Sequence, residues 1–322
     1  MTEVVPASKE NLGRAADLLR AGELVCFPTE TVYGVGADAS NNAAVGRIFR
    51  AKGRPAEHPL IVHLASALSL DEWADEVPEQ ARLLARAYWP GPLTMVLRRG
   101  PRVSTLVTGG QDTVAIRIPA HPLALGLLAE FGGALVAPSA NRFGRISPTR
   151  AEHALTELGD EVAMVLDGGA STIGVESTIV DLSGAVPLLL RPGAVSREQL
   201  ARVLGAAPTS ADEHDGPRAP GRLASHYAPR SPARLVSAEL LERELAGNPG
   251  VSVLARRPAP AGFRSRWLRL PDEPAGYARE LYSALRELDV IGRPILIEEP
   301  PRVPDWEAVN DRLGRAAGPS RA

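Results

Sequence analysis

Short apolar runs alternate with helical segments over most of the chain, and this alternation restricts the possible folds more than any other feature. Each run is four to six residues long, as buried strands usually are. The runs stand at residues 24–27, 60–64, 93–97, 113–118, 134–138, 163–167, 177–182 and 187–191. Apolar residues at helical spacing predict helices near 8–21, 42–51, 78–88, 121–130, 149–158 and 196–204. This succession predicts an α/β or α+β domain built on one large mixed sheet.

A proline-rich segment at residues 207–232 divides the chain. It holds five Pro and two Gly and almost no apolar residue, a composition typical of a linker. The residues after it alternate short strands with helical segments, which predicts a second and smaller α/β unit. We therefore expect a first domain at 1–206, a linker at 207–232 and a second domain at 233–322.

Charge and cysteine content argue against several classes of protein. Thirty-six Lys and Arg against 38 Asp and Glu give a net charge of −2, so the overall field does not favour a nucleic-acid or membrane surface. The single cysteine, Cys26, excludes an internal disulfide framework and a Cys-based zinc site. The first residues lack a signal-peptide pattern, and no stretch approaches about 18 consecutive apolar residues. We expect a cytoplasmic protein without a membrane anchor.

Residues 28–34, PTETVYG, form the densest cluster of functional side-chain types and follow a buried-type strand directly. Ligands of open α/β sheets bind at the carboxyl ends of strands, where this segment offers hydroxyls such as Thr31 and the Glu30 carboxylate. The alternative is a polar strand-to-helix turn in which Gly34 and Gly36 supply positive φ angles. The residues alone leave both interpretations open.

Two cations, Lys52 and Arg54, stand two residues apart at the end of a predicted helix. This arrangement can place an ammonium and a guanidinium on one anion, although cations at a helix end are also favourable partners of the helix dipole. The chain then returns into a strand that ends at His63, which favours a binding role.

Arg117 interrupts the apolar strand VAIRIP, where at least one face is expected to be buried. A buried charge of this kind costs several kcal/mol unless it is paired. Its partner is either the carboxylate or phosphate of a substrate or a structural Asp or Glu.

The segment 138–149, PSANRFGRISPT, follows another apolar strand and resembles an anion-binding turn that leads into a helix. Ser139, Asn141 and Ser147 are its candidate ligands, and an ordinary serine-rich loop with a helix cap is the alternative. Ser177 at a strand start and Arg191 at a strand end add to the set. Neither a P-loop, a Rossmann dinucleotide fingerprint nor a GxSxG elbow occurs in the sequence.

In chain order, seven motifs resemble the Sua5/YciO/YrdC family: FPTETVYGVGADA, KGRPAEHPLIVHL, YWPGPLTMVL, VAIRIP, APSANRFGRISPT, GVESTIVD and LRPG. The linker motif APGRLASHYAP and the ending WEAVNDRLGRAA resemble the longer Sua5 branch of that family. The resemblance implies a YrdC-like domain with a large twisted mixed sheet flanked by helices. It also implies a small Rossmann-like α/β Sua5 domain.

The resemblance also implies an activity. Family members are L-threonylcarbamoyladenylate synthases, which convert L-threonine, bicarbonate or CO2, and ATP into threonylcarbamoyl-AMP and pyrophosphate. The product serves the t6A modification of tRNA, so the implied partners are the downstream t6A-transfer machinery and small-molecule substrates. Mg²⁺ is expected with ATP, and neither a membrane nor a stable nucleic-acid complex is expected.

Carried over motif by motif, the resemblance assigns residues to two substrates. Those implied for L-threonine are Thr31, His63, Arg117, Ala137 through its main chain, and Ser177. Those implied for ATP are Lys52, Arg54, His58, Thr113, Ser139, Ser147, Arg191 and Tyr227, with Lys52 and Arg54 also catalytic. His58 stands where the family often has Asn and would add a pH dependence. The linker, with His226 and Tyr227, is the candidate lid over the site.

Two further interpretations come from relatives of the same fold. The isolated YrdC-like domain is known in the family as a double-stranded-RNA binder, against which the charge of −2 argues. A carbamoyl-transfer enzyme resembling hydrogenase-maturation proteins is disfavoured because this sequence lacks their acylphosphatase-like and zinc-binding segments.

Overall fold

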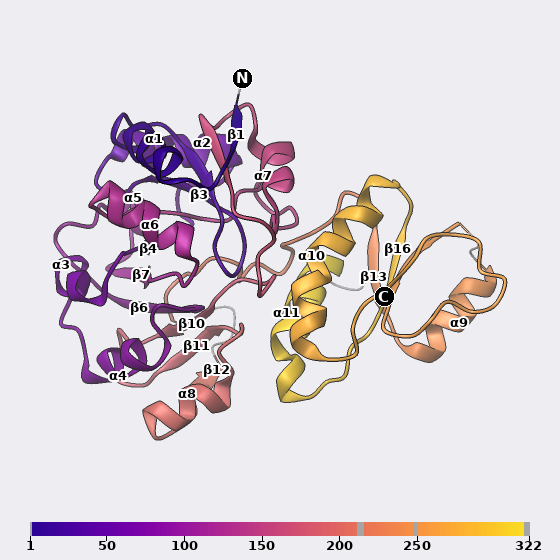
Figure 1. Cartoon of the computed structure of the whole chain (residues 1–322). Helices are drawn as coiled ribbons and strands as arrows, with labels where there is room; N and C mark the ends of the chain where they lie inside the picture. Colours follow the sequence, from indigo (N-terminus) through magenta and orange to yellow (C-terminus); the bar gives the residue numbers. More distant parts are fainter. Residues whose placement is uncertain (1, 211–215, 248–249, 319–322) are drawn as a thin grey trace.

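The structure is a computed structural model that describes residues 2–210, 216–247 and 250–318. Figure 1 shows two units: a large-sheet unit, from the N-terminus through residue 210, and a small-sheet unit, from residue 233 onward. Residues 216–232, the connecting segment, run between them. None of the helices in these ranges is long and apolar enough to cross a membrane.

The large-sheet unit is built on a twelve-stranded mixed sheet in which parallel and antiparallel neighbours alternate irregularly. From one edge to the other its strands are β1 (Glu3–Pro6), β9 (Met164–Asp167), β2 (Val25–Phe27), β3 (Gly34–Asp38), β8 (Leu135–Val136), β4 (Ile61–His63), β7 (Thr113–Arg117), β6 (Leu93–Arg99), β10 (Thr178–Asp181), β11 (Leu188–Arg191) and β12 (Thr209–Ser210). A short strand, β5 (Ala74–Asp75), pairs with β6 off this path. The mixed sheet expected from the sequence is confirmed.

Helices flank this sheet (Figure 1). They are α1 (Lys9–Arg20), α2 (Asn42–Lys52), α3 (Leu70–Trp73), α4 (Glu79–Tyr88), α5 (Thr105–Thr108), α6 (Pro122–Phe131), α7 (Ala151–Leu158) and α8 (Arg197–Leu204), with a 3-10 turn, η1 (Ala67–Ser69). Local sequence sets the ends of several: the Ser8 side chain caps α1, and Ser196 and Gln199 form a capping box at α8. Gly53, at φ +61°, ends α2 directly after Lys52.

Gly34 and Gly36 lie in strand β3 and not in the strand-to-helix turn that one interpretation of the sequence gave them. Neither has a positive φ angle. Gly36 instead allows two strands to lie close together. A Cβ on Gly36 would stand 2.7 Å from the Phe27 ring of the antiparallel neighbour β2. The turn of this segment is therefore shorter than expected, and the chain returns beside the strand it left.

Strand register brings four of the predicted site residues together where neighbouring strands of the large sheet begin or end, a part called here the edge region. His63 and Arg117 end the parallel strands β4 and β7 and are paired in register. Ser177 precedes β10, whose neighbour β6 runs antiparallel to β7, and Arg191 ends β11, which runs antiparallel to β10. Residues far apart in sequence thus meet because strand ends and strand starts alternate along this edge.

The small-sheet unit is a parallel four-stranded sheet in the order β13 (Ala233–Val236), β16 (Ile295–Glu298), β14 (Ser252–Ala255) and β15 (Trp267–Arg269). Its helices are α9 (Ala238–Gly247), α10 (Pro274–Val290) and α11 (Glu307–Ala317), with a 3-10 turn, η2 (Pro304–Trp306). The unit agrees with the small α/β domain expected, although the sequence pattern missed β15. In Figure 1, α10 and α11 lie on the side that faces the large-sheet unit.

The connecting segment is bonded to both units. Ala228 donates its amide to the Gly144 carbonyl of the large-sheet unit at 2.9 Å. The amides of Ser231 and His226 bond to the other side, to the Asp289 carboxylate at 2.7 Å and to the Arg315 carbonyl at 3.2 Å. The segment is thus held in place along its described length rather than spanning open solvent.

Candidate active site

A small cavity of about 50 Å³ lies between the edge region of the large sheet and the connecting segment. Nine residues implied by the family resemblance line it: Thr31, Arg54, His63, Arg117, Ala137, Ser139, Ser177, Arg191 and Tyr227. The cavity therefore collects side chains that the sequence spreads over nearly 200 positions.

At one end, called the Arg117 end, the Arg117 guanidinium is held by the chain itself. It donates to the Glu30 carboxylate at 2.6 Å, to the Thr31 hydroxyl at 2.8 Å and to the Gly91 carbonyl at 3.2 Å. Of the two partners left open by the sequence, the structure therefore supplies a structural carboxylate, Glu30. Three N–H groups of Arg117 are used in these bonds, which leaves others for a ligand in the cavity.

His63 stands beside Arg117 as a neutral imidazole. Burial, together with the positive charge of Arg117, lowers the pKa of His63 to about 3. Its Nδ1 lies 3.2 Å from the Ile61 carbonyl, so Nδ1 carries the proton and donates to that oxygen. The other ring nitrogen, Nε2, is then an acceptor, suited to a ligand hydroxyl.

Ala137 and Ser177 complete the Arg117 end. The Ala137 amide donates to the Ile61 carbonyl at 3.1 Å, so its carbonyl is the main-chain group suited to a ligand donor. The Ser177 hydroxyl lies 2.7 Å from that of Thr94 and accepts from Arg191 at 3.2 Å. Ser177 therefore joins the two ends of the cavity through hydrogen bonds.

At the other end, called the cation end, Lys52, Arg54 and Arg191 are each at least nine-tenths buried. Their partners are neutral oxygens: Lys52 donates to the Ser139 and Asn141 carbonyls, Arg54 to Pro59 at 2.9 Å and Arg191 to Pro220 at 2.9 Å.

Within the described ranges none of these three cations forms an ion pair with Asp or Glu. Buried positive charge without a counter-ion is costly, so this end favours a polyanionic ligand.

The charge states follow from this environment. Burial and, to a smaller extent, the nearby Arg54 together lower the pKa of Lys52 to about 7. Burial likewise lowers the pKa of Arg54 to about 10 and also lowers that of Arg191. An anion bound between them would reverse each shift, because opposite charge favours the protonated form.

Four of the implied ATP residues do not line the cavity. Lys52 lies one contact behind its wall, through the Ser139 carbonyl, and Ser147 donates to the Glu176 carboxylate at 2.5 Å. His58 packs its ring 5.1 Å from that of Phe143, close to Arg54.

Thr113 is the farthest of the four along the sheet. It begins β7, on the same face as Arg117 by strand alternation. Between them Ala115 packs in an apolar cluster with Ala219 of the connecting segment. The connecting segment therefore covers the sheet surface between Thr113 and Arg117.

Tyr227 occupies a strained position within the connecting segment. Its φ angle is +61°, rare for a residue with a side chain, and its ring lies edge-on to His226 at 4.2 Å between centroids. The Tyr227 hydroxyl and His226 Nδ1 are buried without a hydrogen-bond partner among the described residues. Both residues line the cavity, so these two polar atoms are suited to a ligand.

The sequence offered Glu30 only as a polar group for a ligand, and it gave Glu176 no role. Glu30 is the counter-ion of Arg117, and Glu176 lines the cavity and accepts hydrogen bonds from Ser147, Tyr282 and Arg312. Both lie inside motifs quoted above, but one sequence does not reveal which cation each carboxylate meets. Only the folded arrangement sets those pairs.

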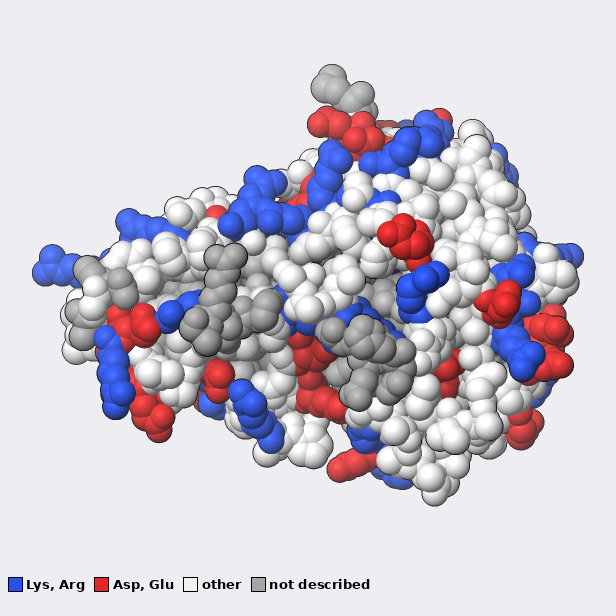
Figure 2. All heavy atoms as spheres, turned by 180° about the vertical axis from the view of Figure 1, so that it is seen from behind, with Lys and Arg blue, Asp and Glu red and all other residues white. Residues whose placement is uncertain are grey.

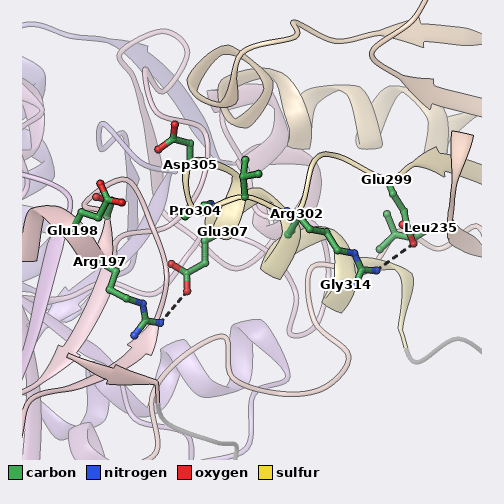
Figure 3. A pocket seen from close by; sticks show the side chains of 12 residues that line it. Arg197, Glu198, Leu235, Glu299, Arg302, Pro304, Asp305, Glu307 and Gly314 are labelled. Carbon is green, nitrogen blue, oxygen red and sulfur yellow. Dashed lines mark hydrogen bonds and ion pairs between the residues drawn. The ribbon is translucent and has the colours of Figure 1, made fainter. Parts of the chain in front are cut away.

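A larger pocket, of about 640 Å³, lies between α8 and the η2–α11 region (Figure 3). Both arginines that line it are paired with a carboxylate of the lining, Arg197 with Glu307 at 3.0 Å and Arg302 with Glu299 at 3.5 Å. None of the residues implied for threonine or ATP lines it. Despite its size, this pocket lacks the unpaired buried charge that distinguishes the cation end.

Comparisons with known proteins agree with this geometry. The Sua5/YciO/YrdC family model, described as "Telomere recombination", matches residues 17–193. A second model, described as "Threonylcarbamoyl-AMP synthase, C-terminal domain", matches residues 195–318. The two matches follow each other along the chain, as the large-sheet and small-sheet units do.

Similar proteins carry consistent names. A threonylcarbamoyl-AMP synthase of Bacillus subtilis is 45% identical over 225 residues, which are 69% of this chain and 65% of that protein. One of Pyrococcus abyssi is 50% identical over 191 residues, which are 59% of this chain and 56% of that protein. The aligned segments thus span less than two thirds of either relative.

A solved structure extends the similarity to nearly the whole chain. The crystal structure of P. abyssi Sua5 complexed with L-threonine has a TM-score of 0.91 and 38% identity, covering 98% of this chain and 97% of that one. Its agreement includes both units. The chain is accordingly a member of the Sua5/YciO/YrdC family, in the branch that carries a C-terminal Sua5 domain.

Proposed function

We propose that the protein is an L-threonylcarbamoyladenylate synthase, which makes threonylcarbamoyl-AMP and pyrophosphate from L-threonine, bicarbonate or CO2, and ATP. One observation supports this above others: a single cavity joins a buried arginine already paired with Glu30 to two buried cations, Arg54 and Arg191, and a third, Lys52, lies directly behind its wall. None of these three cations has a carboxylate partner in the described ranges. The first end suits a small amino acid and the second a triphosphate. The names of the relatives agree with this proposal.

Threonine is proposed to bind at the Arg117 end. The N–H groups of Arg117 that the chain does not use would receive the substrate carboxylate. The Nε2 atom of His63 would accept a hydrogen bond from the substrate hydroxyl. Such a bond distinguishes threonine from amino acids without a hydroxyl, because they would leave a buried acceptor unpaired.

ATP is proposed to bind at the cation end, with Lys52, Arg54 and Arg191 around its phosphates. The threonine nitrogen attacks CO2 and loses a proton, and the resulting carboxylate attacks the α-phosphorus as pyrophosphate leaves. The cations would neutralise the charge on the departing pyrophosphate, and no protein nucleophile is required.

Mg²⁺ would enter with its substrate. Among the residues of known placement, no three His, Cys, Asp or Glu side chains group as metal ligands. MgATP is therefore treated as one substrate, and the protein's own part is to hold the phosphates.

We propose that the first domain, 1–206, holds both substrates and that the linker, 207–232, closes over them. The cavity of about 50 Å³ is too small for ATP and threonine together, and Pro220, Gly221 and Tyr227 form part of its wall. The connecting segment would therefore rise to admit ATP and return to exclude water from the hydrolysable product. The second domain, 233–322, would anchor that movement.

The product would pass to the t6A-transfer machinery in the cytoplasm, without a stable nucleic-acid complex. Figure 2 shows basic and acidic side chains interspersed over the described part of one face, in keeping with the net charge of −2. Such a surface does not favour strong binding of a polyanion such as RNA.

Pyrophosphate release and threonylcarbamoyl-AMP formation by the full chain test the proposal. Both are expected only when threonine, bicarbonate and ATP are present together. Serine is the matched control substrate, since it keeps the hydroxyl and lacks the methyl group. Equal pyrophosphate release with serine, or without an amino acid, would contradict the assignment of threonine.

A further inference from the structure

Arg312 belongs to the small-sheet unit but reaches into the site of the large-sheet unit. It lies on α11 with no exposed surface. Its guanidinium donates to the Glu176 carboxylate at 2.7 Å and to the Pro192 carbonyl at 3.0 Å, both across the boundary between the units. Asp311, its neighbour on α11, also pairs with it. An arginine buried this deeply requires such partners, so its position is set from both sides.

Glu176, which Arg312 holds, is part of the cavity wall. Its carboxylate also accepts from Ser147 at 2.5 Å and from Tyr282 of α10 at 3.0 Å. Burial alone would raise its pKa, but Arg312 and Arg191 outweigh that effect and lower the pKa to about 2. Glu176 is thus an ionised side chain fixed by donors from three separate segments.

Arg312 also touches the connecting segment at its strained residue. Its guanidinium carbon lies 5.4 Å from the centroid of the Tyr227 ring, a cation–π arrangement. One turn farther along α11, Arg315 accepts from the His226 amide at 3.2 Å and donates to the Leu223 carbonyl at 2.6 Å. Helix α11 therefore fixes both the cavity wall and the segment above it.

We propose that Arg312 is a positioning residue, which holds the Glu176 carboxylate and the Tyr227 ring in the arrangement that ATP meets at the cation end. The small-sheet unit thereby completes the nucleotide site instead of merely anchoring the linker. The identity of the ligand rests on the proposed function, whereas the contacts that Arg312 makes do not.

A second ion pair between the same two units supplies a matched control. Arg286 of α10 pairs with Glu157 of α7 at 3.1 Å, and both side chains are mostly buried. Neither lines the cavity. Replacing Arg286 therefore removes a buried contact between the units while leaving Glu176 and Tyr227 held by Arg312.

The test compares Arg312→Met with Arg286→Met in the full chain, by threonine-dependent pyrophosphate release. For Arg312→Met we expect the KM for ATP to rise about tenfold while the KM for threonine changes less than about threefold. For Arg286→Met we expect neither KM to change more than about threefold. Equal changes in the two variants would show a general docking role and overturn the proposal.

A double-variant cycle tests whether Arg312 acts through Glu176. If it does, Glu176→Gln combined with Arg312→Met should raise the KM for ATP less than the product of the two single effects. A simple product would overturn the proposal. Thermal unfolding of each variant shows whether it is folded. If Arg312→Met does not fold, Arg312→Lys, which keeps the charge, takes its place and should bind ATP more weakly than the wild-type chain.

Failure of the proposed function gives a different result. If the wild-type chain releases no pyrophosphate with threonine, the assigned reaction is wrong. Calorimetry with ATP alone still compares Arg312→Met with Arg286→Met in that event. A loss of ATP affinity confined to Arg312→Met supports its positioning role, and equal affinities contradict it.

Discussion

The two ends of the cavity bury their cations in opposite ways. At the Arg117 end, the guanidinium is paired with Glu30 at 2.6 Å, so the charge is balanced before a ligand arrives. At the cation end, Lys52, Arg54 and Arg191 rest on carbonyl and hydroxyl oxygens, without a carboxylate partner in the ranges that the structure describes. Neutral oxygens satisfy the N–H groups but leave the positive charge in place.

This difference is the physical basis for the ligand that we propose at each end. A paired arginine offers directed N–H donors with little net charge, which suits a zwitterion whose own ammonium would be repelled by an unpaired cation. Buried cations without a carboxylate partner suit a polyanion, and they repel one another until a polyanion binds. The type of ligand that a buried arginine binds therefore depends on whether a carboxylate of the chain is paired with it, which the sequence alone does not show.

The largest expected effect is loss of a charge at the cation end. Lys52→Met should lower the rate of threonine-dependent pyrophosphate release by about a hundredfold or more, because the leaving phosphates lose a neutralising donor. Threonine affinity should stay within about threefold, since the Arg117 end is unchanged. Rates are measured by pyrophosphate release and affinities by calorimetry.

Arg50→Met is the control for Lys52→Met. Arg50 lies on the same helix, α2, two residues earlier, but is exposed. If Arg50→Met slowed the reaction as much as Lys52→Met, the effect would belong to the helix and not to the buried charge.

The Arg117 end should show a smaller and opposite pattern. Arg117→Met should weaken threonine binding by about fiftyfold, because hydrogen bonds to a charged group are lost. The affinity for ATP should be nearly unchanged. Calorimetry with each substrate separates the two.

Glu30 refines the interpretation of that variant. Arg117→Met strands the buried Glu30 carboxylate, so its thermal stability should fall, and adding Glu30→Gln should restore much of it. Threonine affinity should remain weak in the double variant. Recovery of threonine binding there would show that Arg117 served only to neutralise Glu30.

A third prediction concerns protons at the cation end. With a pKa of about 7, Lys52 loses its proton as pH rises through neutrality in the ligand-free protein. Bound phosphates raise the pKa of Lys52, so the protein should take up a proton when ATP binds above pH 7. The affinity for ATP should therefore fall by up to about tenfold for each unit that the pH rises above 7. Calorimetry in buffers of different ionisation enthalpy counts the protons. Lys52→Met should abolish the uptake.

Much of the fold could be predicted from the sequence because its strands are short apolar runs between turn residues. The family, the mixed sheet and the second α/β unit are all confirmed. Strand β3 was missed because Gly34 and Gly36 lack side chains to give an apolar pattern, and their role is close approach to β2. Strand β15 is only three residues long, too short to show a period.

Most of the residues that line the cavity could be named from the sequence, but their pairing could not. Motif resemblance selected Arg117, and the structure places it in the cavity. The sequence could not choose between a substrate carboxylate and Glu30 as its partner, because that choice depends on where the turn after β2 directs a side chain. Arg312 was hidden for the same reason: its partner Glu176 lies 136 positions earlier in the chain, in the other unit.

The smallest effect is expected at His58, at the margin of the cation end. Burial, with a contribution from Arg54, lowers the pKa of His58 below its usual value, so the ring is neutral at pH 7 and the expected pH dependence moves to more acidic conditions. His58→Asn should therefore change the KM for ATP by less than about threefold at pH 7.5, since both side chains remain neutral donors. As the pH falls through the lowered pKa of His58, the variants should diverge, because only His58 gains a positive charge that attracts phosphate. Parallel pH profiles of the two proteins would exclude His58 from the ATP site and restrict the cation end to Lys52, Arg54 and Arg191.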